Sequence, residues 1–170
     1  MNNAICIDGD IYIMTFEEFK KKIRLLNDTE AEDIRKKYIH KFINMNAEGY
    51  HLQIESLHKF VDGYCYEGYL WDYIKNPIII DDNYIRYIAQ KNHDHVFVFW
   101  DIHSCERILI KDYWKFGKNT VIKLKLSDLI EGYRYLPEDI YIFDKSMSWT
   151  LIKTHEEIGD SPYVIKSGDI

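Results

Sequence analysis

The sequence predicts a single α+β domain spanning residues 1–170, in which N-terminal helices pack on a mostly antiparallel sheet that ends in a C-terminal β-hairpin. Helical periodicity dominates the first half of the chain, whereas β-forming runs dominate the second half. At 46% hydrophobic residues, 170 residues can bury one core. Because helices precede most of the strands, we expect separate layers, with helices covering one face of the sheet.

The N-terminal third predicts one hairpin and two helices. Residues 3–14 form two β-prone runs around an Asp-Gly turn. Thr15 and Glu18 have the spacing of a capping box, which starts a helix that runs to about Asn27. A second helix is predicted from about Thr29 to Asn44, with an apolar stripe along one side. The short link between the two helices favours an antiparallel or steeply crossed pair.

The middle of the chain alternates between short helical and extended segments. Residues 55–61 predict a helical turn, and residues 64–75 predict a tyrosine-rich helix that Pro77 ends. Residues 77–80 predict a short strand. Asp81 or Asp82 then caps a helix that runs to residue 91.

The C-terminal half is mostly strand. The run HVFVFWDI, residues 95–102, is apolar on both faces and predicts a buried strand. Residues 107–110 and 120–126 predict further strands, the second with its lysines outward, and Ser127 is expected to cap a short helix. The terminal hairpin pairs residues 140–143 with 149–152 around a polar turn, and a last strand is expected at residues 163–165.

Charge and cysteine content narrow the classes of partner. The net charge of −6 disfavours nucleic acid and anionic membranes, but suits a basic protein partner. The three widely spaced cysteines match neither a disulfide framework nor a zinc motif. Without a leader pattern or an apolar run of about 20 residues, we expect a cytoplasmic protein without a cofactor.

An aromatic-acidic segment, residues 62–76, is the best candidate for a binding surface. Tyrosine and tryptophan supply contact area, and carboxylates supply complementary charge toward a basic protein. The competing interpretation is a helix with a tyrosine-rich core face. The candidate binding residues are Asp62, Tyr64, Tyr66, Glu67, Tyr69, Trp71 and Asp72.

Titratable side chains gather at the open end of the terminal hairpin. His155 and Glu156 end the second strand, and Asp139, expected opposite Lys153, precedes the first. A carboxylate beside an imidazole can support acid–base chemistry or ligand binding, with His103 as a further candidate. The competing interpretation is a solvated strand end.

A metal or a nucleophilic cysteine is less well supported. His95 and Asp101 share one strand face with His93 and His103, but about 20 Å of extended strand separates them, so one ion cannot bind both. Cys105 lies near His103, yet no family signature surrounds it. Phosphate-loop, dinucleotide, hydrolase-elbow and metalloprotease motifs are absent from the sequence. We therefore expect no metal site.

The block LPEDIYIFDKSMSWTLIKTHEE, residues 136–157, resembles a recurring C-terminal block of small uncharacterised bacterial proteins. Some of those relatives are similar to immunity proteins encoded near polymorphic toxins. The resemblance implies an immunity-type binding function and assigns no catalytic role to the block. The matching positions are Tyr141, Phe143, Asp144, Trp149, Thr150, Thr154, His155 and Glu156.

Together these features favour a non-enzymatic binding protein that inhibits a bacterial toxin through an acidic aromatic surface. The alternative is a small hydrolase-like or ligand-binding domain that uses His155 and Glu156. A third option is a homodimer that buries exposed tyrosines at its interface.

Overall fold

A computed structural model describes residues 13–61, 63–91, 95–101, 116–117, 119–159 and 161–169. In these residues the main sheet is seven-stranded and antiparallel, with the strand order β1-β6-β5-β7-β8-β9-β4. The predicted α+β class is confirmed. The strand expected at 107–110 and residues 3–12 of the hairpin expected at 3–14 lie outside the described residues. The last two residues of that hairpin, 13 and 14, are described and do not belong to a strand. The strands of the sheet are β1 (Arg24–Leu25), β4 (Ile78–Ile80), β5 (His95–Trp100), β6 (Ile122–Lys125), β7 (Ile140–Phe143), β8 (Trp149–Ile158) and β9 (Ser161–Gly168).

Three of the described α-helices, α1, α2 and α3, begin at polar caps that are visible in the sequence. The predicted capping box of α1 is present, because Thr15 and Glu18 exchange hydrogen bonds between side chain and backbone. A second box, which the sequence analysis missed, joins Asn27 and Glu30 at the start of α2. Asp81 caps α3 by accepting a hydrogen bond from the Asn83 N–H at 2.7 Å. The helices are α1 (Phe16–Lys22), α2 (Asp28–Phe42), α3 (Asp82–Lys91) and α4 (Leu126–Gly132), with short turns η1 (His51–Glu55), η2 (Leu70–Tyr73) and η3 (Tyr133–Tyr135).

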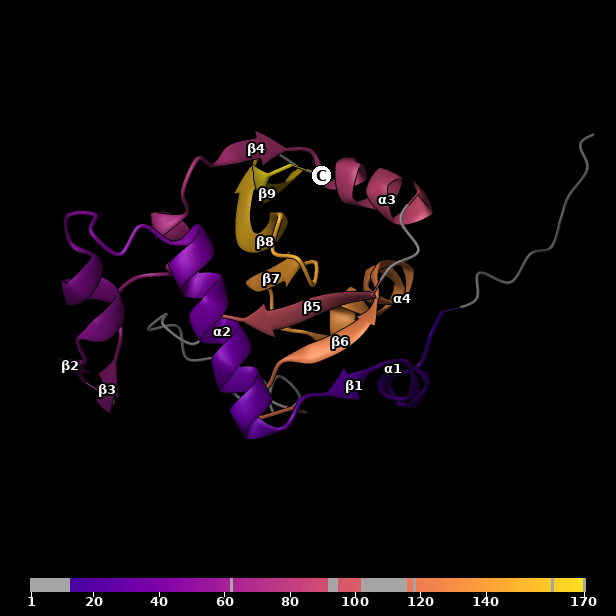
Figure 1. Ribbon diagram of the computed structural model, residues 1–170, viewed down its shortest axis with the longest axis horizontal. Coiled ribbons are helices and arrows are strands. Elements are labelled where there is room, and N and C mark those ends of the chain that lie inside the picture. Colours follow the sequence, from indigo (N-terminus) through magenta and orange to yellow (C-terminus); the bar gives the residue numbers. More distant parts are fainter. Residues whose placement is uncertain are drawn as a thin grey trace, which may run out of the picture.

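Helices cover both faces of the sheet, so the expectation that they cover one face is wrong. In the view of Figure 1, α2 lies to one side of the sheet and α1, α3 and α4 lie to the other. The reason is the apolar character of β5 on both faces. Val98 packs into the core beneath α1, α3 and α4, whereas Phe99 packs into the core beneath α2. Alternate side chains of β5 thus point to opposite faces of the sheet and pack in two separate cores.

The first two helices do not form the expected pair. Phe19 of α1 packs in one core and Tyr38 of α2 packs in the other. Strand β1 lies between these helices in the sequence and pairs with β6 at the sheet edge. The short link therefore carries the chain from one face of the sheet to the other.

The predicted helix at residues 64–75 is wrong. Strands β2 (His58–Phe60) and β3 (Gly63–Cys65) form a separate two-stranded ribbon, and within residues 64–75, all of which are described, the only helical turn is η2. Gly68 explains part of this difference, since its N–H donates to the Gln53 carbonyl at 3.0 Å and a Cβ there would lie 2.9 Å from the Gln53 Cβ. The helical turn expected at residues 55–61 is also displaced, because η1 ends at Glu55.

The terminal hairpin is confirmed, with one correction to its register. Ile140 pairs with Lys153, whereas the sequence predicted Asp139 at that position. The turn is one residue longer than expected because Asp144 accepts hydrogen bonds from the N–H groups of Ser146 and Ser148 at 3.0 Å each. Strand β8 also extends to Ile158 and pairs with β9.

Strand β6 and the start of α4 show one further difference. Ile122 and Leu124 are buried and Lys125 is exposed, as the alternation predicted. Ser127, however, lies inside α4, and Lys125 occupies the N-cap position.

Candidate functional site: an acidic-aromatic patch

Asp139 and His155 meet at the open end of the β7–β8 hairpin, as the sequence predicted. The backbone N–H of His155 donates to Asp139 Oδ1 at 3.0 Å, and its Nδ1 lies 3.0 Å from both carboxylate oxygens. The pairing of β8 with β9 shifts register between Lys153 and Glu157, so a bulge lies beside His155. The carboxylate fixes the orientation of the imidazole and favours a proton on Nδ1.

The environment of Asp139 disfavours its charge. The residue is only 6% exposed. The pKa of Asp139 lies above its ordinary value, chiefly because burial raises it. The hydrogen bonds and charge of His155 lower this pKa, and the negative charge of Asp101 raises it further.

Asp101 joins this hairpin to the aromatic-acidic segment. It lies just beyond the end of β5 and is buried. Its Oδ2 accepts a hydrogen bond from the Leu70 N–H at 2.7 Å and another from the Tyr141 hydroxyl at 2.5 Å. Its own N–H donates to the Asp139 carbonyl at 3.0 Å. Asp101 was weighed as a metal ligand from the sequence, whereas its contacts in the structure place η2 against the sheet.

Aromatic rings cover the imidazole. Tyr69 stacks on Trp71 with centroids 5.4 Å apart and planes inclined at 22°. The His155 ring lies 4.9 Å from the Tyr69 ring and 6.3 Å from the Trp71 ring. Trp71 is 8% exposed, so it acts as core under the site, and Tyr69 supplies the accessible ring.

Asp72 adds surface charge beside the hairpin. It is exposed, and its carboxylate accepts a hydrogen bond from the Tyr69 N–H at 3.2 Å. The pKa of Asp72 lies above its ordinary value, chiefly because partial burial raises it. The hydrogen bond from Tyr69 and the charge of His155 lower this pKa, whereas the charges of Asp101 and Glu156 raise it. Two of these effects come from neighbouring carboxylates, so the site carries an excess of negative charge.

We call this cluster the acidic-aromatic patch. It combines members of two predicted sets, because three residues come from the binding segment and three from the hairpin alternative. The patch consists of Tyr69, Trp71, Asp72, Asp139, His155 and Glu156.

The other predicted binding residues lie elsewhere. Tyr64 is 66% exposed on β3, and Tyr66 and Glu67 follow in the next loop. Glu67 pairs with His58 of β2, with 3.5 Å between Oε1 and Nδ1. Asp62 of the binding set and His103 of the alternative set lie outside the described residues.

The structure places two of the four residues that share one face of the predicted strand, His95 and Asp101. His95 and Asp101 lie at opposite ends of the strand. In the described part of the chain, no three His, Cys, Asp or Glu side chains are grouped to hold a metal ion. His93 and Cys105 lie outside it. None of the described helices is long and apolar enough to cross a membrane.

The fold and the site define an antiparallel α+β protein with an acidic, aromatic surface cluster. A family model matches residues 12–164, and the chain therefore belongs to the family described as a domain of unknown function, DUF4275. Searches of curated proteins and of solved structures found no match.

Proposed function

We propose that this protein is a non-enzymatic binding protein of the immunity type, which acts in the bacterial cytoplasm by covering the active site of a toxin. The observation that carries the proposal is the meeting of Asp72 and Glu156 around Tyr69 and His155, from segments far apart in the sequence. Such a surface suits a lysine or arginine side chain of a basic partner.

The energetics favour a cation at this position. Asp72 is repelled by the charges of Asp101 and Glu156, and a cation held beside the exposed carboxylates of Asp72 and Glu156 would relieve this repulsion. Tyr69 offers a ring face or edge to the same cation. Because the Leu70 N–H is held by Asp101, the segment loses little conformational entropy when a partner docks.

The alternative function is a small ligand-binding or hydrolase-like domain. The Asp139–His155 pair favours it, because a carboxylate that orients an imidazole is a recurring acid–base arrangement. His155→Gln distinguishes the two functions. In a binding protein this change weakens association modestly, whereas in an enzyme it abolishes turnover.

The test uses the protein as bait in its native host. The wild type and a charge-reversed variant, Asp72→Lys with Glu156→Lys, are each used to recover partners for mass spectrometry. We expect a basic protein that is enriched by the wild type and lost with the variant. Co-expression of the wild type should also protect cells from a toxin encoded beside its gene.

The matched control is Glu17→Lys with Glu131→Lys. Both glutamates are exposed and belong to α1 and α4, which cover the opposite face of the sheet. This double variant changes the net charge by the same amount as the patch variant, and it should retain the partner. If no basic protein is recovered and no neighbouring toxin is neutralised, the proposal is wrong.

A further inference from the structure

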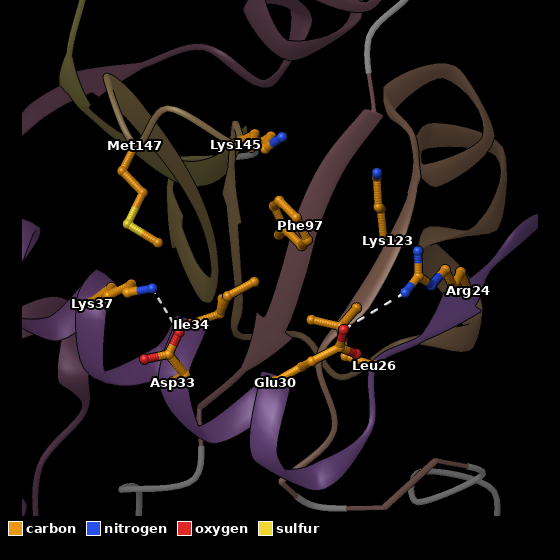
Figure 2. A pocket seen from close by; sticks show the side chains of 10 residues that line it. All are labelled: Arg24, Leu26, Glu30, Asp33, Ile34, Lys37, Phe97, Lys123, Lys145 and Met147. Atoms are coloured by element: carbon orange, nitrogen blue, oxygen red, sulfur yellow. Dashed lines mark hydrogen bonds and ion pairs between the residues drawn. The ribbon is translucent and has the colours of Figure 1, made fainter.

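A pocket of about 480 Å³ lies at the other end of β5, on the same face of the sheet as α2. Figure 2 shows α2 below the pocket, with Lys145 of the β7–β8 turn above Phe97 and Lys123 of β6 to the right of Phe97. Its volume falls in the range of small-molecule sites. We call it the basic pocket; its lining includes Arg24, Lys37, Phe97, Lys123, Lys145 and Met147.

The basic pocket carries positive charge in an acidic protein. Two of its four cations are neutralised locally: Arg24 lies 3.8 Å from Glu30, and Lys37 lies 2.6 Å from Asp33. Lys123 and Lys145 form no ion pair with any residue that the structure describes. The Lys123 Nζ instead lies 5.8 Å from the centroid of the Phe97 ring. These two ammonium groups are therefore available to an anion.

The same two lysines also line a second hollow of about 560 Å³ beside the pocket. His95 lines it as well, and so does Asp144. The Asp144 carboxylate is engaged by the N–H groups of Ser146 and Ser148 within the turn. Lys123 and Lys145 thus lie where the two hollows meet, and an anion between them would be reached from either side.

The remaining wall is apolar. It consists of Leu26, Ile34, Phe97 and Met147. Figure 2 shows Ile34 and Leu26 below the Phe97 ring. Apolar side chains beside a few convergent charges are the usual composition of a small-molecule site. A ligand that fills the pocket would therefore combine an anionic group with an apolar body.

The turn that supplies Lys145 and Met147 is held in an unfavourable backbone conformation. Met147 has φ of 52°, in the left-handed region that residues with a Cβ rarely adopt. Its N–H donates to the Asp144 carbonyl at 3.1 Å, which stabilises the turn. Asparagine or glycine would suit this position better on local grounds. The methionine side chain instead extends the apolar wall of the pocket.

From these observations we propose that the basic pocket binds a small organic phosphate, with the phosphate between Lys123 and Lys145 and an apolar body against Phe97 and Met147. A phosphate monoester carries nearly two negative charges at neutral pH, which matches the two unpaired ammonium groups. A carboxylate carries one charge. Long polyanions are disfavoured by the net charge of −6. The site is separate from the acidic-aromatic patch and does not depend on the proposed function.

The test uses phenyl phosphate as a probe of minimal size, followed by amide chemical shifts of the full-length protein. We expect saturable shifts at Phe97, Lys123, Lys145 and Met147, with Kd of about 1 mM or tighter. Inorganic phosphate tests the charge alone, phenol the apolar body alone, and benzoate a singly charged analogue. Each should bind at least about tenfold more weakly than phenyl phosphate.

Two variants assign the binding to this pocket. Lys123→Gln with Lys145→Gln should weaken binding of phenyl phosphate about tenfold or more, and Met147→Asn should weaken it severalfold while the protein stays folded. The control is Lys20→Gln with Lys36→Gln, which removes two exposed lysines outside the pocket and should leave the affinity unchanged. The proposal is overturned if phenyl phosphate produces no shifts at these residues, if it binds no better than phosphate or phenol, or if the Lys123/Lys145 variant binds as tightly as the wild type.

Discussion

The Tyr141 hydroxyl donates to the carboxylate of Asp101 at 2.5 Å, in the interior between the sheet and η2. The same carboxylate oxygen accepts the N–H of Leu70, so a tyrosine of β7 helps to orient the group that holds η2 in place. Tyr69 and Trp71, which flank Leu70, cover His155. The position of the acidic-aromatic patch therefore depends on a buried hydrogen bond outside it.

Replacing Tyr141 with phenylalanine should destabilise the protein and loosen η2. Loss of the hydroxyl leaves the buried Asp101 carboxylate with one donor fewer, which costs about 1–3 kcal/mol of unfolding free energy. Urea denaturation measures this loss. Hydrogen exchange should also become faster at the Leu70 amide. Tyr64→Phe, on a 66% exposed tyrosine, is the control and should change stability by less than about 0.5 kcal/mol. Equal effects of the two changes would contradict this role of Tyr141.

Asp72→Asn should alter the pH dependence of stability in a defined direction. Because the pKa of Asp72 is raised above 3.8, mainly by partial burial, the folded protein holds this proton more tightly than the unfolded chain does. Stability contributed by the protonated form is therefore lost as pH rises through the folded pKa. Relative to Asp72→Asn, the wild type should lose unfolding free energy as pH rises from about 4, near the unfolded pKa, through the raised folded pKa. Urea denaturation at each pH gives the unfolding free energies of the two proteins. A difference between them that does not change with pH would refute the prediction.

Asp144→Asn should show the opposite sign. Burial alone would raise the pKa of Asp144, but the hydrogen bonds from Ser146 and Ser148 outweigh it and hold the pKa below 3.8. This carboxylate stabilises the fold above its unfolded pKa, and that stability is lost as pH falls through the folded pKa. The variant should therefore be less stable than the wild type at pH 7, with a difference that shrinks on acidification. A difference that grows on acidification would show that the turn bonds do not lower this pKa.

Gly132→Ala should disrupt the packing of α1 on α4. A Cβ at this position would lie 2.2 Å from Cδ2 of the buried Phe19 ring. Overpacking of this kind costs about 1–3 kcal/mol. Thermal or urea unfolding gives the loss, and Glu131→Ala, on the exposed neighbouring residue, is the control. The double variant Phe19→Leu with Gly132→Ala should cost less than the sum of the single changes, since both alter one contact. Strict additivity would exclude the clash.

Met147→Asn should leave stability unchanged or raise it by up to about 1 kcal/mol, because asparagine tolerates the left-handed region better than methionine does. The same change removes part of the apolar wall of the basic pocket. A gain in stability together with weaker binding of phenyl phosphate would indicate that the methionine is retained for the ligand. A loss of more than about 1 kcal/mol would indicate that its packing outweighs the backbone strain.

Local signals predicted the elements that local interactions stabilise. The Thr15–Glu18 capping box, the α2 stripe with Tyr38 and the terminal hairpin are all confirmed. The proximity of Asp139 to His155 followed from counting along that hairpin, and the error of one residue came from the extra turn residue that Asp144 stabilises.

Features that depend on distant residues were missed. The irregular path around Gly68 and Leu70 is stabilised by the Gln53 carbonyl and by Asp101, which lie far away in the sequence. Because of this path, the predicted binding residues are divided: Tyr64 lies on the β2–β3 ribbon, whereas Tyr69, Trp71 and Asp72 lie in the acidic-aromatic patch. The basic pocket draws Lys123 and Lys145 from separate segments, and no spacing within the sequence associates them.

Strand β5 connects two regions of opposite charge. The strand begins at His95, which lies beside Lys123 and Lys145. Just beyond its last residue lies Asp101, which is near Asp72 and Asp139. Six residues of extended chain separate these ends by about 20 Å. The two groups of charge thus contribute an electric dipole parallel to the strand. In solution of low ionic strength, this dipole would rotate a charged molecule into a preferred orientation before the first contact is made.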